Sequence, residues 1–334
     1  IIQAVGLGCA SAAAGRRVLH YLQLESYQLP GYVKSVRRNA MRALIPPIAM
    51  AAVGVAALRL SGLTGLALLL EALTAALLVW QAAKEKAKKP FVATERVKRL
   101  LAVHVAVNTV LALALLTVSP VLGYLLPAFE PALLMLAALI AAPMEKHIAG
   151  QFMKDAQARL AAQPGLIKIG ITGSYGKTST KFLLRDILSV KYNVLATPSS
   201  FNTPMGVTRV IREQLTPAHQ VFIAEMGARH VGDIRELVEL VHPQVGLITS
   251  VGPQHLDTFG TIERVRDTKY ELIEGLPKDG TAVFARDGAI CEALFERCPL
   301  ERKYKPGMLV DAKNVACGPW GTRFTLTDVQ TGEE

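Results

Sequence analysis

The sequence predicts a fold in two parts: an α-helical membrane region over residues 1–150, then an α/β domain over residues 151–334 in which helices flank a mostly parallel sheet. Two observations predict it. Hydrophobic residues make up 51% of the 334 residues against 19% charged, and most of the apolar excess precedes Gly150. The second half instead carries short apolar runs typical of buried parallel strands, among them Val221–Ala224 and Val245–Thr249.

The first part contains apolar runs of about the 20 residues that cross a bilayer. They are Ala43–Leu60, Leu63–Ala82, Leu100–Val118 and Val121–Ala142, the last interrupted by Pro127 and Pro131 so that Phe129–Ala142 is its better spanning part. Ile1–Gly15 has the composition of the end of another helix, which gives about four to five spans. Because Ile1 lies inside an apolar run and Glu334 inside a predicted sheet, we expect a fragment that is truncated at its C-terminal end.

Basic residues concentrate in two connections between these runs, residues 16–42 and 84–99, while the alternate connections are nearly bare. They are Arg16, Arg17, Lys34, Arg37, Arg38 and Arg42 in the first, and Lys84, Lys86, Lys88, Lys89, Arg96, Lys98 and Arg99 in the second. Basic loops stay in the cytoplasm, so this pattern predicts a multi-pass cell-membrane protein whose second domain is cytoplasmic. The net charge of +10 then reflects topology and the lipid bilayer as partner, and we expect no nucleic acid.

One carboxyl group, Glu71, lies in the middle of the second apolar run. A charge at mid-bilayer is costly, which by default indicates a functional group. The alternative is a carboxyl that is protonated or bonded to a neighbouring helix. We favour the alternative because the sequence offers no second intramembrane charge as a partner.

A glycine-rich turn follows the first predicted strand of the second domain, Leu166–Ile171, and precedes a helical stretch, Thr180–Val190. Its residues are Thr172, Gly173, Ser174, Tyr175, Gly176, Lys177, Thr178 and Ser179. A strand, a turn of this kind and a helix bind phosphate, because loop amides and the helix N-terminus face the anion. The generic pattern is not met strictly, since position 171 is isoleucine. We expect a P-loop-type nucleotide site, with Lys177 on the outer phosphates and Thr178 on Mg²⁺.

Two polar residues follow other predicted strands at the edge where ligands of α/β sheets bind. Glu225 ends the run Val221–Ala224, and His255 comes after Val245–Thr249. Alone, Glu225 could partner a helix N-terminus and His255 could be a packed imidazole. Together with Thr178 they favour a divalent-metal site. Lys269, judged by its own pattern, is a solvated lysine.

Four motifs in this order resemble the Mur ligase family. They are the turn at 172–179, Phe201–Thr208, Ala224–Ile234 and Ile248–Thr261, and the resemblance covers about Leu166 to Glu334. It implies that Asn202 and Thr203 meet a UDP-muramoyl substrate and that a carbamylated Lys269 joins Thr178, Glu225 and His255 as a metal ligand. Lys177, Glu225, His255 and Lys269 would be the catalytic residues.

The resemblance also implies an ATP-dependent ligase of cell-wall peptidoglycan synthesis that uses Mg²⁺ and an acyl-phosphate intermediate. Its acid substrate would be a UDP-muramoyl-peptide or related carboxylate, and its amine one such as D-alanyl-D-alanine. The alternatives are another Mur-type ligase, of folyl-polyglutamate type or an amidotransferase partner, and a non-catalytic membrane-tethered nucleotide-binding scaffold. Membrane helices stand in place of the family's first domain, and the last would lie beyond Glu334 or be absent. Ala285 replaces an asparagine that usually contacts adenine.

Overall fold

The computed structural model describes residues 1–85, 90–199 and 201–333. The chain divides into two compact units, Ile1–Ile148 and Ala149–Glu334. The sequence placed the boundary at residue 150. One continuous helix, α8 (Glu130–Ala161), passes through the boundary between the two units.

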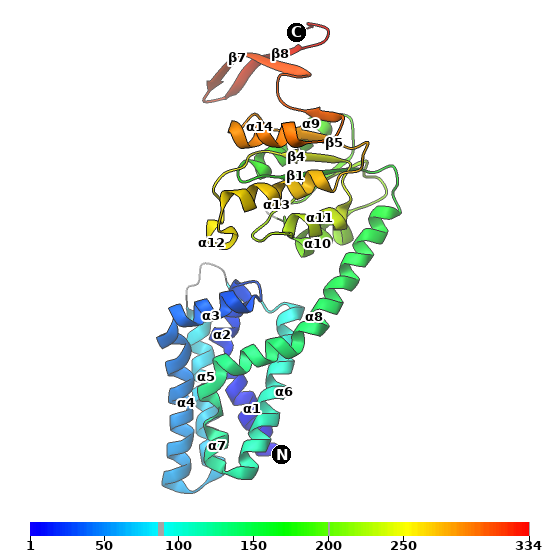
Figure 1. Cartoon of the computed structure of the whole chain (residues 1–334). Coiled ribbons are helices and arrows are strands. Elements are labelled where there is room, and N and C mark those ends of the chain that lie inside the picture. Colours follow the sequence, from blue (N-terminus) through cyan, green and yellow to red (C-terminus); the bar gives the residue numbers. More distant parts are fainter. Residues whose placement is uncertain (86–89, 200, 334) are drawn as a thin grey trace. The chain divides into compact units, whose positions relative to one another are not determined.

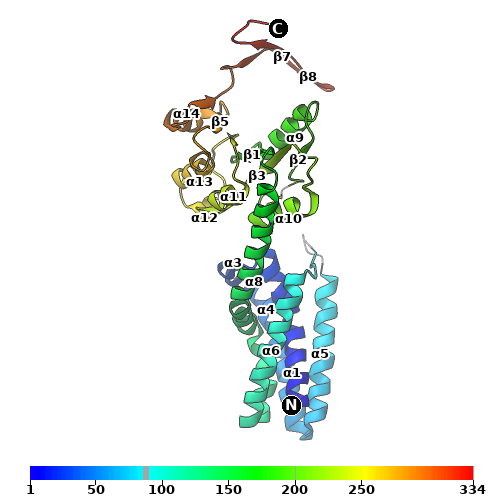
Figure 2. The same cartoon turned by 90° about the vertical axis from the view of Figure 1, so that its right-hand side faces the viewer.

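The first unit is a bundle of helices (Figures 1 and 2). Its elements are α1 (Ile2–Ala14), α2 (Arg16–Leu24), α3 (Leu29–Arg38), α4 (Ala40–Ser61), α5 (Thr64–Lys84), α6 (Glu95–Val118), α7 (Pro120–Tyr124), the 3₁₀ helix η1 (Leu126–Phe129) and the first part of α8. Within the described residues, four helical segments are long and apolar enough to cross a membrane: α4, α5, α6 and Leu126–Ala161. Their length and composition are compatible with a membrane region.

The basic connection at 16–42 is not the loop that the sequence suggested. It folds into α2 and α3, whose apolar residues Val18, Leu19, Leu22 and Tyr32 are buried. Helical spacing places these side chains on one face of each helix, which leaves the arginines and lysines on the other. In the second basic connection α6 begins at Glu95, capped by the Thr94 hydroxyl. Lys86, Lys88 and Lys89 lie outside the described residues.

The two prolines of the fourth apolar run interrupt the helix where predicted. Pro127 lies in η1, and Pro131 occupies the first turn of α8, where a helix needs no N–H group from it. Pro143 lies inside α8, and the helix continues past it to Ala161.

A pair of buried ionisable groups, which the sequence analysis missed, lies in the first unit in addition to Glu71. Glu130 Oε1 accepts a hydrogen bond of 2.5 Å from Ser11, and Glu130 Oε2 is 3.0 Å from His104 Nε2. All three side chains are fully buried, as is Glu71. We expected Glu71 to be either protonated or bonded to a neighbouring helix. Its carboxyl oxygens have no hydrogen-bond partner among the described residues, so the bond is not formed and protonation stays a prediction.

The second unit is an α/β domain. Its elements are β1 (Ile167–Thr172), α9 (Lys177–Leu188), β2 (Val194–Ala196), α10 (Pro204–Gln214), β3 (Val221–Glu225), α11 (Asp233–Val241), β4 (Val245–Ile248), α12 (Leu256–Phe259), α13 (Ile262–Glu274), β5 (Thr281–Phe284), α14 (Gly288–Arg297), β6 (Arg302–Tyr304), β7 (Val310–Gly318) and β8 (Gly321–Asp328). Over the described ranges, β1 to β6 form a parallel sheet in the order β2-β3-β1-β4-β5-β6. The predicted mostly parallel sheet with flanking helices is confirmed.

Helices cover both faces of this sheet (Figure 1). On one face α9 packs through Leu184 and Leu188 against Ile169, Ile171 and Ile223. The opposite face carries the larger core, to which α10, α11, α13 and the last turns of α8 contribute. Since β1 is the central strand between β3 and β4, the loops after these three strands meet at one edge of the sheet. The antiparallel hairpin β7–β8 is a separate, largely exposed element.

Candidate functional site

The turn between β1 and α9 depends on glycine at two positions. Gly176 has a φ of +81°, which residues with a side chain rarely adopt. Gly173 has a φ of +148°, and a Cβ there would lie 2.1 Å from Thr249 Oγ1. The turn is therefore packed directly against the end of β4, and a larger residue at 173 would push the two loops apart.

Two amides of this turn are already engaged. Ser174 N donates to Ser250 O at 2.8 Å, and Tyr175 N donates to Ser250 Oγ at 2.7 Å. In this structure these two amides therefore do not face the space where a phosphate would bind. The first N–H groups of a helix have no intrahelical partner, so those of Lys177, Thr178 and Ser179 are among the donors that the fold can offer to an anion.

The Lys177 side chain folds back over the turn. Its Nζ donates to Gly173 O at 2.6 Å and lies 3.3 Å from Ser174 O. Burial lowers the Lys177 pKa, and the Glu225 carboxylate partly opposes that shift. The amine is thus held above the loop by carbonyl oxygens, which a phosphate oxygen can replace.

Glu225, at the end of β3, connects several segments of the site. Its Oε2 accepts from Thr178 Oγ1 at 3.0 Å and from Lys181 Nζ at 2.9 Å, while its Oε1 accepts from Asn202 Nδ2 at 3.1 Å. The Glu225 N–H donates to the Thr197 hydroxyl. The predicted pairing of Glu225 with Thr178 is present in this geometry, and the side chain is 1% exposed.

Sequence reasoning missed Lys181, which is fully buried. A signal was available, because Lys181 shares a helical face with Leu184 and Leu188, three and seven residues later. That face packs on the sheet. A lysine where the pattern requires an apolar residue indicates a buried charge with a partner, here Glu225.

The solvated lysine predicted at 269 is wrong: Lys269, on α13, is 1% exposed. Burial, followed by the nearby Lys177 ammonium, lowers its pKa to about 8. The helical face of α13 that holds it also holds the core residues Val265 and Leu272, so tertiary packing decides its burial. At pH 7 an amine with this pKa is neutral in about a tenth of the molecules, far more than an ordinary lysine.

His255 precedes α12 and has a φ of +54°, a strained value for a residue with a side chain. The residue is exposed, yet partial desolvation, then the charges of Arg229 and Lys269, lower its pKa. Its ring is therefore largely neutral at pH 7, the form that can bind a metal. The charge of Lys269 thus acts on the pKa of His255, while direct hydrogen bonds in the site join Glu225 to Thr178.

The two predicted substrate residues have internal roles. The Asn202 side chain donates to Glu225, and the Asn202 backbone carbonyl oxygen accepts a hydrogen bond from Gly227 N at 2.8 Å. A Cβ at Gly227 would lie 2.7 Å from Asn202 Cγ, so glycine permits this contact. The Thr203 hydroxyl caps α10 by accepting from Gly206 N. Asn202 nevertheless lies beside the phosphate turn through its hydrogen bond to Glu225, and Thr203 is the next residue in the chain.

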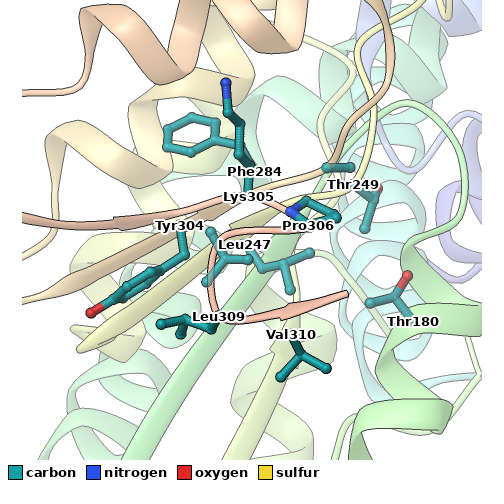
Figure 3. Close-up of a pocket in the computed structure, with 11 residues that line it drawn as sticks. Thr180, Leu247, Thr249, Phe284, Tyr304, Lys305, Pro306, Leu309 and Val310 are labelled. Atoms are coloured by element: carbon teal, nitrogen blue, oxygen red, sulfur yellow. The ribbon is translucent and has the colours of Figure 1, made fainter. Parts of the chain in front are cut away.

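An apolar pocket of about 390 Å³ adjoins the turn. Tyr304 and Leu309 lie on one side of it, and Thr180 and Thr249 on the other (Figure 3). Thr249 Oγ1 also donates to Tyr175 O at 2.6 Å, which joins the pocket wall to the turn. Ala285 is one of the lining residues. A flat apolar group attached to a phosphate chain fits this arrangement.

The oxygen ligands present suit a magnesium ion that arrives with a nucleotide. Thr178 and Glu225 offer a hydroxyl and a carboxylate, which Mg²⁺ prefers. Among the residues that the structure describes, no three His, Cys, Asp or Glu side chains are grouped closely enough to hold a metal. Mg²⁺ commonly completes its coordination with phosphate oxygens and water, so this incomplete set fits it.

Residues 171–333 match the family described as the Mur ligase middle domain. The second unit is therefore a Mur ligase middle domain, as the motifs at 172–179, 201–208, 224–234 and 248–261 predicted.

Among its relatives are enzymes named UDP-N-acetylmuramoyl-tripeptide--D-alanyl-D-alanine ligase. The one from Mycobacterium tuberculosis (strain ATCC 25618 / H37Rv) is 40% identical over 130 residues, 39% of this chain and 25% of the relative. That of Escherichia coli (strain K12) is 30% identical over 158 residues, 45% of this chain and 35% of the relative. This chain thus spans about a quarter to a third of their length. The ADP complex of the MurF ligase from Thermotoga maritima has a TM-score of 0.49 and 28% identity, over 55% of this chain and 43% of that one.

Proposed function

We propose that the chain carries the ATP-binding part of a membrane-anchored ligase that forms an amide bond in cell-wall precursor synthesis. The observation that carries the proposal is the assembly of a glycine-rich turn, Lys177 and the Thr178–Glu225 pair at one edge of a parallel sheet. The names of the relatives favour a UDP-muramoyl-tripeptide as the acid and D-alanyl-D-alanine as the amine.

The proposed reaction has two steps. A carboxylate oxygen of the acid attacks the γ-phosphorus of ATP, the bond to the β–γ bridging oxygen breaks, and ADP leaves. The amine nitrogen then attacks the acyl carbon, the bond to phosphate breaks, and an amide, phosphate and a proton result. Anions meet in the first step, so positive charge from Lys177 and the α9 N-terminus lowers its barrier.

Mg²⁺, when bound with ATP, would supply further positive charge to the phosphates. Thr178 and Glu225 would hold it, with His255 and a carbamylated Lys269 as further ligands. The lowered Lys269 pKa supports carbamylation, because only the neutral amine reacts with CO₂, and the reaction releases a proton. The buried surroundings of Lys269 would keep the carbamate from water.

We also propose that the first unit spans the cell membrane several times and that the second lies in the cytoplasm. Four long apolar helices among the described residues and the basic residues of the 16–42 and 84–99 connections support this topology. The lipid bilayer is then a partner of the chain, and the anchor would keep the ligase near lipid-linked precursors.

The test is ATP-dependent phosphate release by the full-length protein with UDP-muramoyl-tripeptide and D-alanyl-D-alanine. Release should require both substrates and should fall at least a thousandfold in Lys177→Ala, but not in Lys191→Ala, an exposed lysine beyond the same helix. Lys269→Ala and Lys269→Arg should both be inactive, and a short carboxylic acid should partly rescue only the alanine variant. If the wild-type protein binds ATP but releases no phosphate with any precursor tried, the result would instead support a nucleotide-binding scaffold.

A further inference from the structure

The charge of Glu225 is balanced inside the protein. Lys181 Nζ lies 2.9 Å from Glu225 Oε2, and both side chains are almost completely removed from water. Glu225 also accepts hydrogen bonds from Thr178 and Asn202, but both of these donors are neutral. In the described part of the chain, Lys181 is the cation in direct contact with this carboxylate.

Lys181 also binds a segment that approaches the site from another direction. Its Nζ donates to Ser199 O at 2.5 Å, in the connection between β2 and α10. Asn202, in the same connection, donates to the other carboxyl oxygen. One ammonium group therefore fixes the orientation of Glu225 and holds Ser199 beside it.

This geometry affects whether Glu225 can bind a second cation. A carboxylate offers about four lone-pair positions, and Lys181, Thr178 and Asn202 occupy three of them. The remaining attraction for a second cation is weak, because the ammonium at 2.9 Å cancels most of the field of the carboxylate. No other His, Cys, Asp or Glu cluster among the described residues compensates for this.

We propose that Lys181 is a positioning residue that acts as an internal counter-ion to Glu225, so that the site takes up a divalent cation only together with a nucleotide. This inference deepens the proposed function, whose nucleotide phosphates would supply the missing negative charge. Replacing Lys181 by an uncharged residue should convert Glu225 into a cation site that no longer needs the nucleotide.

The experiment uses the full chain in detergent and measures Mn²⁺ binding by electron paramagnetic resonance without nucleotide. Lys181→Met should bind Mn²⁺ at least about tenfold more tightly than wild type. Lys181→Arg, which keeps the charge, and Lys191→Met, which changes an exposed lysine, should behave as wild type. Adding Glu225→Gln to Lys181→Met should abolish the gain. If Lys181→Met does not fold, Lys181→Gln takes its place, because it keeps a donor without the charge.

Tight Mn²⁺ binding by wild type without nucleotide would overturn the inference, as would unchanged Mn²⁺ binding in the folded uncharged variants. A separate titration of wild type with ATP and Mg²⁺ tests the proposed function. If wild type does not bind ATP, the Mn²⁺ result measured without nucleotide still stands. The inference about Lys181 and the proposed function can therefore fail independently.

Discussion

Three lysines set the charge of the candidate site, and each is held differently. Lys177 rests on loop carbonyl oxygens, Lys181 is paired with Glu225, and Lys269 is buried with a lowered pKa. Only the first is placed to exchange its partners for phosphate oxygens. The second is committed to the carboxylate, and burial lowers the pKa of the third to about 8. Identical residue types therefore take different chemical roles because their surroundings differ.

Lys269 should make stability depend on pH. Its pKa is about 8 in the folded chain, against an ordinary lysine value of about 10.5 in the unfolded chain, so the unfolded chain binds more protons between these values. The free energy of unfolding should rise from about pH 8 to about pH 10.5, by about 3 kcal/mol. Lys269→Met should be more stable than wild type at pH 7 and lack this rise. Denaturant unfolding of both proteins in CO₂-free buffer is the measurement; equal slopes would contradict the burial argument.

Ala285 should weaken discrimination between nucleotide bases. It lines the apolar pocket beside the turn. The resemblance to the Mur ligases implies an asparagine at this position. One missing hydrogen bond is worth about 1–3 kcal/mol, so ATP and GTP should bind the full chain with affinities within about a hundredfold. Ala285→Asn should increase the preference for ATP. Calorimetry decides this, and a wild-type preference above about a hundredfold, about 2.7 kcal/mol, would show that another residue recognises the base.

At the scale of elements, periodicity predicted most of what the structure contains. The apolar runs became α4, α5 and α6, and the strand–turn–helix motif became β1, the turn and α9, because each is determined by local spacing. The basic connection at 16–42 was misjudged since its charges concealed two amphipathic helices.

Tertiary contacts were harder to predict. The helical spacing of Lys269 with Val265 and Leu272 was a local signal of its burial. Nothing local, however, indicates that Ser250 engages the amides of Ser174 and Tyr175. The Glu130–His104–Ser11 cluster escaped for the same reason, because its members come from three helices that are distant in sequence. The candidate site was therefore predicted at its motifs, while its internal hydrogen bonds required the structure.

The packing of α1 on α6 should depend on a glycine. A Cβ at Gly8 would lie 2.7 Å from the Thr109 backbone nitrogen, whereas Gly65 has open space around it. Gly8→Ala should separate the two helices and cost about 1–3 kcal/mol. Gly65→Ala, the matched control within α5, should be neutral or stabilising by up to about 1 kcal/mol. Thermal unfolding in detergent compares the two variants; equal midpoints would refute the close approach.

At the scale of the whole molecule, a helical unit with four long apolar helices in its described residues is joined by α8 to a Mur ligase middle domain. Comparison with relatives identifies the family of the second unit, and the sequence shows the charge pattern of the first. Neither residue-level chemistry nor the fold of one unit alone explains why the two occur in one chain. The proposed membrane anchoring of an ATP-dependent ligase would explain it, and this proposal makes orientation a testable property.

The charge pattern predicts that Ser61 faces the outside and Lys34 the cytoplasm. In a background without Cys9, Cys291, Cys298 and Cys317, single cysteines at these two positions can be treated with a membrane-impermeant thiol reagent in intact cells. Ser61→Cys should be labelled, and Lys34→Cys only after the membrane is permeabilised. The reverse pattern would overturn the topology and place the second unit away from cytoplasmic ATP.

The central claim is that the second unit binds ATP through the turn at 172–179, and titration of the full chain with ATP and Mg²⁺ tests it most directly. Wild type should bind one ATP per chain, and Lys191→Ala should bind it equally well. Lys177→Ala should lose at least about a hundredfold in affinity, because a cation on the phosphates is removed. Equal ATP affinity in wild type and Lys177→Ala, or no ATP binding by folded wild type, would contradict the claim.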